Sequence, residues 1–417
     1  MRSNFEPLGK YIRKVNNRND NSEIETLKGI NIHKEFMPSV ANTIGSNMAK
    51  YRVVSQWQFA YNPMHVGRDE VLPISMSKDD TKVIVSPAYT VFEIEDHNQL
   101  NPEYLMMWCR RSEFDRNAWF TTDNSVRGGF SWESLCEMEL PVPSIEKQRE
   151  IVAEYNAVVD RIELNEQINQ NLEETAKAIY RQWFEEFEFP ISKEYAENVG
   201  KPELEGKPYK SCGGEMVYNK ELDKEIPKGW EAKPVYDIAE FINGASFKSK
   251  EFSKRDFGLP IIKIEELKKG INEKTRFTEI KKRSKFRIFN GSLLYSWSGN
   301  PETSLNLFKW FGGEAWLNQH IFKIELIEEI SRTFVVNTLK ELKPTFIRLA
   351  KGKQTTGLGH ITVKDLKELH IPYPDTVTLN EFYKLTFPLY ELDSLLTKEG
   401  LTLNMLSELQ CEKLTLT

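Results

Sequence analysis

Two Asn-Pro dipeptides are the residues in this sequence that come nearest to a group-transfer site. They occur in Asn62-Pro63-Met64-His65 and in Asn300-Pro301-Glu302. An enzyme that methylates the amino group of a base also needs a second proline and an aromatic residue to hold the flipped base. Neither segment has these residues, and the chain has no FxGxG-type loop for S-adenosylmethionine. The sequence therefore argues against a methyltransferase.

A metal-dependent nuclease is the second chemistry to consider. Asp256 is followed by a strand-like run and then by Glu266-Leu267-Lys268, which superficially matches an Asp…Glu-x-Lys metal site. Such spacing is common by chance in Lys/Glu-rich sequence, and we expect a solvated charged turn. The 6 histidines and 4 cysteines lack the spacing of zinc ligands, and no GxxxxGK[ST] phosphate loop occurs. We predict no catalytic residue and no metal ligand.

Contact with DNA is the chemistry for which the sequence supplies candidates. Residues 248–287 carry a local excess of base that can neutralise phosphates, although an ordinary solvated face would look the same. Two Thr/Gly loops, 121–130 and 352–360, offer hydrogen-bonding groups for base edges, and their glycines allow close backbone approach. The candidate DNA-binding residues are Thr121, Thr122, Asn124, Arg127, Lys281, Lys282, Arg283, Trp297, Ser298, Asn300, Gln319, Lys353, Gln354, Thr355 and Thr356.

Each of these candidates has a plainer alternative. The two loops could be polar connections in which glycine supplies a positive φ. Burial in the core is a commoner fate for a large aromatic such as Trp297 than insertion into DNA. Gln319 has an amide that suits adenine, but it could equally cap a turn.

A long amphipathic helix is the element that must position these residues. The segment 144–187 follows Pro141 and Pro143 and contains no proline or glycine. Its seam residues recur in steps of four and three, a heptad pattern: Ile151, Tyr155, Val158, Ile162, Asn165, Asn169, Leu172, Ala176, Ile179 and Trp183. A lone helix of roughly 60 Å has nowhere to bury this stripe, so a partner helix is expected. An ordinary domain-linking helix is the alternative.

The partner helix comes from an internal repeat. Met138-Glu-Leu-Pro-Val-Pro143 matches Leu369-His-Ile-Pro-Tyr-Pro374, and each segment leads into a long helical pattern. The predicted seam of the second helix contains Phe382, Leu385, Leu389, Leu392, Leu396, Leu403 and Leu406. Pro388 and Gly400 interrupt it, so we expect a kink or broken turn at each. Antiparallel pairing would place two similar heads at opposite ends of a rod with pseudo-twofold symmetry.

The fold class predicted from these patterns is α+β, with two α/β heads and two long helices that form an antiparallel coiled coil. The segments expected are a first head (1–143), a central spacer helix (144–187), an irregular linker (188–227), a second head (228–375) and a distal spacer helix (376–417). The 417 residues are 40% hydrophobic and 28% charged, as in a soluble globular protein. No run of eighteen apolar residues occurs, the first residues lack the apolar core of a secretory signal, and the scattered cysteines suggest free thiols in a reducing cytoplasm.

At this level of detail the chain resembles the specificity subunit of a type I restriction–modification system. The resemblance lies in LPVPSIEKQREIV (140–152), ELNEQINQNLEETAKAIYRQWF (163–184), IPKGWE (226–231), GSLLYSWSGNPETSL (291–305) and LNQHIFKI (317–324). It implies two target-recognition domains, each reading one half of a bipartite double-stranded DNA target. It also implies that the helices dock two methyltransferase (M) subunits, joined by restriction/translocase (R) subunits.

The same resemblance implies a chain without catalysis or cofactor of its own. S-adenosylmethionine would belong to the methyltransferase subunit, and ATP and Mg to the restriction subunit. Two other classes of protein stay open on the residues alone. A fused restriction or modification enzyme would need the missing cofactor motifs, and a structural adaptor would bind proteins through its heads.

Overall fold

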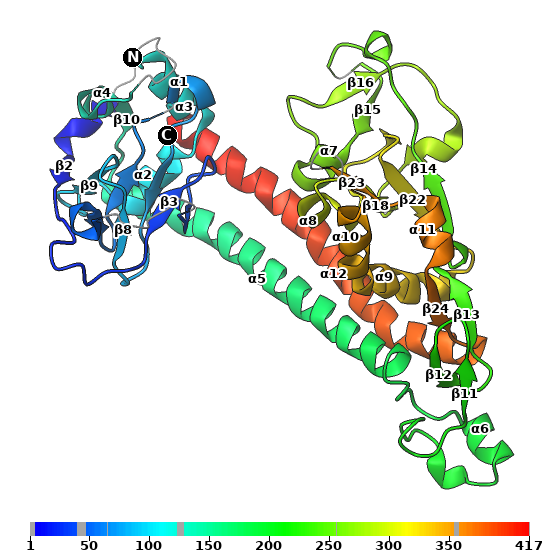
Figure 1. The fold of residues 1–417 in the computed structure, drawn as a ribbon. Coiled ribbons are helices and arrows are strands. Elements are labelled where there is room, and N and C mark those ends of the chain that lie inside the picture. The colour runs from blue at the N-terminus through cyan, green and yellow to red at the C-terminus, as the bar shows by residue number, and fades with distance from the viewer. Residues whose placement is uncertain are drawn as a thin grey trace. The chain divides into compact units, whose positions relative to one another are not determined.

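The computed structural model describes residues 5–39, 47–64, 66–122, 129–255, 257–353 and 358–416. The chain divides into unit 1, Met1–Leu164 with Gly400–Thr417, and unit 2, Asn165–Glu399. The long helix α5 (Ile145–Phe184) begins in unit 1 and ends in unit 2, whereas α12 (Thr376–Glu412) begins in unit 2 and ends in unit 1 (Figure 1).

A four-stranded antiparallel sheet forms the centre of unit 1, in the order β2 (Ile12–Val15), β9 (Thr90–Ile94), β6 (Phe59–Tyr61), β7 (Ile74–Met76). Helices α2 (Pro102–Cys109) and α3 (Ser112–Phe120) follow β9 in the chain. Large aromatic side chains fill the core, and the Phe59 and Phe92 rings stack with their centroids 4.9 Å apart. The other elements are β1 (Phe5–Pro7), β3 (Lys28–Ile30), β4 (Phe36–Pro38), β5 (Arg52–Val54), α1 (Val66–Asp69), β8 (Val83–Val85), α4 (Trp132–Glu137) and β10 (Glu139–Pro141).

Unit 2 repeats this sheet and adds a second one. Its antiparallel sheet has the order β14 (Glu240–Asn243), β22 (Ile321–Glu325), β18 (Leu293–Ser296), β20 (Asn306–Lys309), followed in the chain by α9 (Arg332–Glu341) and α10 (Lys343–Lys351). The additional sheet has the order β16 (Arg276–Thr278), β15 (Leu259–Ile262), β21 (Ala315–Leu317), β17 (Arg287–Ile288). The other elements are β13 (Glu231–Pro234), α7 (Ile264–Lys269), β19 (Ser298–Gly299), α8 (Pro301–Ser304), β23 (Gly359–His360), α11 (Val363–Glu368) and β24 (His370–Tyr373).

The internal repeat is a repeat of hydrogen bonds as well as of sequence. In unit 1, β1 pairs antiparallel with β10 directly before α5, and in unit 2, β13 pairs antiparallel with β24 directly before α12. The Leu8 N–H donates to the Met138 carbonyl at 2.8 Å, and the Val235 N–H donates to the Leu369 carbonyl at the same distance. The Pro-x-Pro segments therefore form the last strand of each head, which confirms the predicted duplication.

The predicted antiparallel pairing of the long helices is confirmed by contacts within unit 2. The Asn165 side chain donates to Glu399 at 2.8 Å, while the Trp183 ring lies 5.5 Å from that of Phe382. Partners thus run in opposite directions along the two helices. In unit 1, Tyr155 of α5 and Cys411 of α12 belong to one core cluster. The remaining predicted seam residues of α5 are half-buried: Ile151, Val158, Ile162, Asn169, Leu172, Ala176 and Ile179.

The inward face of α12 differs from the heptad assignment. Leu396 is buried and Leu389 and Leu403 are half-buried, but Leu385 and Leu392 are 49% and 42% exposed. Thr386, at 1% exposed, takes an inward position because α12 packs on α9 as well as on α5, and its hydroxyl lies 2.8 Å from that of Thr333. A leucine pattern alone could not show that polar residues face inward. A kink or broken turn was expected at Pro388 and at Gly400, and the helix is unbroken at both.

The segment predicted as an irregular linker, 188–227, is an ordered part of unit 2. It contains α6 (Lys193–Asn198) and a hairpin of β11 (Met216–Asn219) and β12 (Lys224–Pro227). Phe189 stacks between Tyr209 and Trp230, with ring centroids 4.6 Å and 5.1 Å away. Its apolar residues are few but large and buried, so composition hid a packed segment.

Candidate nucleic-acid interface

Trp297 occupies the end of strand β18 in unit 2, where β18 passes into the short strand β19. Its ring stacks on Phe322 at 5.6 Å, and its indole N–H donates to the Asn243 side chain at 3.1 Å. The ring is half-buried and packs against the main core of the unit. Trp297 is therefore held rigidly at the edge of the core. One part of its ring is buried, and the other part remains accessible at the surface.

Several other candidates lie around Trp297. Ser298 pairs with His360 in the ladder between β19 and β23. The Gln319 side chain lies 3.3 Å from the imidazole of His320, which in turn lies 5.7 Å from the Trp297 ring. Residues from three segments distant in the sequence thus form one polar rim. His320 and His360 were missed as candidates, although each directly adjoins a residue or loop that the sequence singled out.

Asn300 has a structural role at this rim. Its side-chain oxygen accepts hydrogen bonds from the N–H groups of Glu302 and Thr303, at 3.0 Å and 3.4 Å, and so caps α8. Pro301 stands at the first helical position, where its missing N–H costs nothing. The Asn-Pro dipeptide is thus a helix start, and the Asn300 amide nitrogen is the group left for an external contact.

The basic segment is divided between exposed and anchored cations. Lys281 and Arg283 are exposed ahead of a 3-10 turn at Ser284–Phe286. Lys282 between them is 23% exposed, forms an ion pair with Glu251 at 2.6 Å and lies over the Phe247 ring. The first two are available to phosphates, whereas the third holds the segment onto the protein.

The Thr/Gly loops are described only at their ends. The Thr121 hydroxyl donates to the Asn117 carbonyl at 3.0 Å, and the Thr122 hydroxyl donates to the Trp119 carbonyl at 2.6 Å, so both close the end of α3. Lys353 forms an ion pair with Asp365, whose carboxylate also accepts from the N–H of Thr362, the N-cap residue of α11. The other predicted loop residues lie outside the described residues: Asn124, Arg127, Gln354, Thr355 and Thr356.

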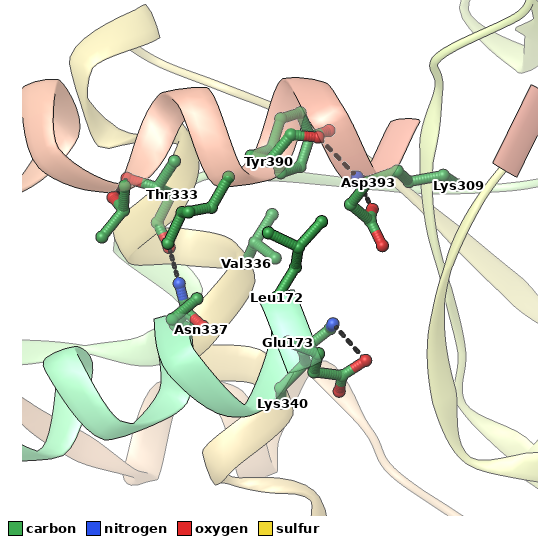
Figure 2. Close-up of a pocket in the computed structure, with 12 residues that line it drawn as sticks. Leu172, Glu173, Lys309, Thr333, Val336, Asn337, Lys340, Tyr390 and Asp393 are labelled. Carbon is green, nitrogen blue, oxygen red and sulfur yellow. Dashed lines mark hydrogen bonds and ion pairs between the residues drawn. The ribbon is translucent and has the colours of Figure 1, made fainter. Parts of the chain in front are cut away.

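In unit 2, strand β20 and helix α9 are attached to the two long helices (Figure 2). A cavity of about 40 Å³ lies between α5, α9 and α12. Lys340 of α9 forms an ion pair with Glu173 of α5 at 2.9 Å, and Lys309 of β20 forms one with Asp393 of α12. Burial lowers the pKa of Lys309, although the Asp393 carboxylate opposes that shift. The first ion pair therefore fixes α9 to α5, and the second fixes the edge strand β20 to α12.

Neither a metal centre nor a membrane span emerges from the part of the chain that the structure describes. No three His, Cys, Asp or Glu side chains there form a group suited to a metal ion. Among the same residues, no helix is both long and apolar enough to cross a membrane. Asp256 of the nuclease-like pattern lies outside the described residues.

Comparison with known proteins shows which proteins the sequence resembles. Residues 227–384 match the model of the type I restriction modification DNA specificity domain. The chain is 28% identical over 264 residues to the type I restriction enzyme MjaIX specificity subunit of Methanocaldococcus jannaschii, and 25% identical over 309 residues to the HindI specificity subunit of Haemophilus influenzae. Each match covers 62% of this chain, but only 55% and 65% of the respective relatives.

The fold has a solved counterpart. The type I restriction–modification S subunit of M. genitalium superposes with a TM-score of 0.52 at 13% sequence identity, covering 98% of this chain and 95% of that one. At this identity the likeness concerns the fold. The matched specificity domain and the two curated relatives make this chain similar to type I restriction–modification specificity subunits, that is, HsdS-like.

Proposed function

We propose that this chain is the non-catalytic DNA-specificity subunit of a type I restriction–modification complex, and that each unit reads one half of a bipartite duplex target. The observation that supports this most directly is the duplicated strand pair that precedes each long helix, β1–β10 before α5 and β13–β24 before α12. The two pairs share an equivalent hydrogen bond, from Leu8 to Met138 and from Val235 to Leu369. A protein that repeats one reading fold suits a target with two separated half-sites.

In unit 2, we propose that the rim around Trp297 contacts base edges. Gln319, Ser298 and the Asn300 amide nitrogen can form hydrogen bonds there, and the Trp297 ring gives the rim a rigid base. Lys281 and Arg283 would neutralise phosphates, which positions a duplex without specifying its sequence. In unit 1 we propose that the Thr/Gly loop 121–130, which follows α3, contacts base edges.

The exposed side of α12 is the proposed docking site for methyltransferase (M) subunits. In unit 2 it carries Leu385, Leu392 and Leu395, which are 49%, 42% and 59% exposed. In unit 1 it carries Met405, Leu406 and Leu409, exposed by 66%, 42% and 55%. Apolar residues at steps of three, four and seven suit the apolar face of another helix. These leucines would therefore pair with helices of two partner subunits rather than with α5.

The proposed division of labour leaves the chemistry to the partners. The methyltransferase subunits would bind S-adenosylmethionine, and the restriction/translocase (R) subunits would bind ATP and Mg. The assembly would act in the cytoplasm, where DNA and these cofactors are present. Within this chain, side chains would recognise DNA and fix geometry.

The test is to express the full chain with its methyltransferase partner and to map methylated adenines in the DNA. We expect methylation at one bipartite site, DNA binding that weakens with salt, and no methylation by the chain alone. Methylation by the chain alone would instead indicate a fused enzyme. An assembled complex without salt-dependent DNA binding would indicate an adaptor and would contradict the proposal.

A further inference from the structure

Phe120 is the last residue of α3 in unit 1, and its side chain is 85% exposed. Its neighbour Trp119 is 44% exposed. The opposite side of the helix is anchored, because Phe114 and Ala118 are buried and the Phe114 ring lies 5.1 Å from that of Trp108. A fixed helix thus presents an aromatic ring to its surroundings, where exposed apolar area favours contact with a partner.

The two threonines that follow Phe120 close the last turn of α3. The backbone N–H of Thr121 donates to Asn117 at 3.1 Å, and that of Thr122 donates to Trp119 at 3.2 Å. Their hydroxyls also donate to carbonyls of the last turn. The backbone of this turn is therefore well defined, and little backbone conformational entropy is lost when Phe120 makes a contact.

The charge around Phe120 favours DNA as the contacting molecule. Of the two acids of α3, Glu113 forms an ion pair with Arg111, and Asp115 forms one with Lys34 at 2.8 Å. Arg116 is exposed and lies one turn before Phe120 on the same helix face. Within α3, both carboxylates are thus paired, and Arg116 supplies a positive charge one turn before Phe120, as contact with phosphates requires.

We propose that Phe120 is a wedge that unit 1 inserts between base pairs of its half-site, with Arg116 on a flanking phosphate. This inference rests on the proposed DNA-reading function. Phenylalanine is one of the side chains that partly unstack a base step and kink the duplex. The step entered is expected to be a flexible pyrimidine–purine step, so that the half-site includes a base step selected by deformability.

Unit 2 lacks the wedge, which provides a control inside the same chain. Helix α10 of unit 2 buries Phe346 and Ala350, as α3 buries Phe114 and Ala118. When these pairs are aligned, Arg348 corresponds to Arg116, and Gly352 corresponds to Phe120. The second half-site is therefore read without an inserted ring at this position.

The experiment uses the assembled complex and DNA that carries 2-aminopurine at single positions of either half-site. We expect fluorescence enhancement at one step of the first half-site with the unchanged protein, and its loss with Phe120→Ala. The same variant should bind DNA about 5- to 150-fold more weakly, the range for loss of one aromatic–base stack, with an unchanged salt dependence. Phe120→Leu should retain part of the effect, since leucine also acts as a wedge.

Arg116→Gln and Arg348→Gln are the matched controls. Arg116→Gln should lower the salt dependence by about one charge without removing the 2-aminopurine signal, and no Phe120 variant should change the second half-site. Unchanged affinity and fluorescence with Phe120→Ala would overturn the wedge while bipartite methylation persisted. If Phe120→Ala prevented the methyltransferase subunits from assembling with this chain in the absence of DNA, Phe120 would be a protein-docking residue. That result would also overturn the wedge proposal. Absence of bipartite methylation by the unchanged complex would instead contradict the proposed function.

Discussion

The side-chain amide of Asn165 donates a hydrogen bond to the carboxylate of Glu399 at 2.8 Å, between antiparallel helices α5 and α12. Asn165 is 2% exposed, and its side-chain oxygen has no hydrogen-bond partner among the described residues. A neighbouring pair, Asn169 and Thr397, repeats the contact at 3.3 Å. Polar pairs in a helix seam are less stable than leucines, but they favour one register over all others.

Replacing Asn165 by leucine should stabilise the helix pair and weaken its register. The leucine would bury apolar surface and remove an unsatisfied oxygen, whereas Glu399 keeps other interactions. We expect the free energy of unfolding to rise by about 1 kcal/mol. Denaturant unfolding measures the gain, and distances between spin labels on the two helices should become broader. A loss of stability would show that the amide contact contributes more than burial does.

The first turns of the two long helices give a second prediction. The Asp375 carboxylate accepts from the Thr378 N–H at 2.8 Å and from the Trp230 indole at 3.2 Å, whereas the Ser144 hydroxyl accepts from the Lys147 N–H at 3.3 Å in the equivalent turn of α5. Asp375→Ala should therefore cost about 1 to 2 kcal/mol of unfolding free energy, and Ser144→Ala less. Asp375→Asn is the control that keeps the cap. Equal losses in both alanine variants would contradict this explanation.

Acid sensitivity should depend on Asp365. Burial opposes its ionisation, but hydrogen bonds from Lys353 and Thr362 outweigh burial and hold the pKa of Asp365 below its usual 3.8. A carboxyl group whose pKa is lower in the folded state stabilises the fold above its unfolded pKa and loses this effect as the pH falls. Asp365→Asn should therefore flatten the fall in unfolding midpoint below about pH 4. An unchanged pH profile would show that the Asp365 carboxylate does not cause the loss of stability in acid.

Neighbouring cations in the basic segment should behave differently. Replacing exposed Lys281 or Arg283 with glutamine should each reduce the salt dependence of DNA binding by about one charge. Lys282→Gln removes a cation already paired with Glu251, so it should lower thermal stability and change the salt dependence less. Titrations at several salt concentrations and melting curves separate the two effects. Equal salt dependences for all three variants would contradict the distinction between exposed and anchored cations.

Much of the fold could be predicted from sequence because its signals are local. The Pro-x-Pro repeat and the heptads of α5 depend on spacing, and the structure places both where the spacing predicts. The inward face of α12 could not be predicted, because the position of Thr386 depends on Thr333 of α9, which is distant in the sequence. The packed segment around Phe189 was missed for the same reason.

The candidate site was harder to predict than the fold. Hydrogen-bonding residues such as Asn300, Thr121 and Thr122 have the right chemistry for bases, but the structure uses them to begin or end helices. Residue type alone cannot distinguish a helix cap from a base contact, since both need the same polar atoms. The His320 and His360 side chains near Trp297 come together only through the strand register.

The length of the two helices should set the unread gap in the DNA target. Inserting seven residues at matching places in α5 and α12 preserves the phase of the seam, because seven residues complete one heptad. The added rise of about 10 Å should lengthen the gap by about three base pairs without changing the bases of either half-site. Mapping methylated adenines in DNA from cells with the assembled variant measures both properties.

Insertion in α5 alone is the matched control for this spacer prediction. It shifts Asn165 and Asn169 away from Glu399 and Thr397, so it should disturb pairing and reduce methylation at every spacing. Since the loops proposed to contact bases lie outside both helices, neither insertion should alter the bases recognised. A paired insertion that changed base identity at a half-site would show that the helices take part in reading sequence. A paired insertion that left the gap unchanged would show that something other than helix length sets the spacing.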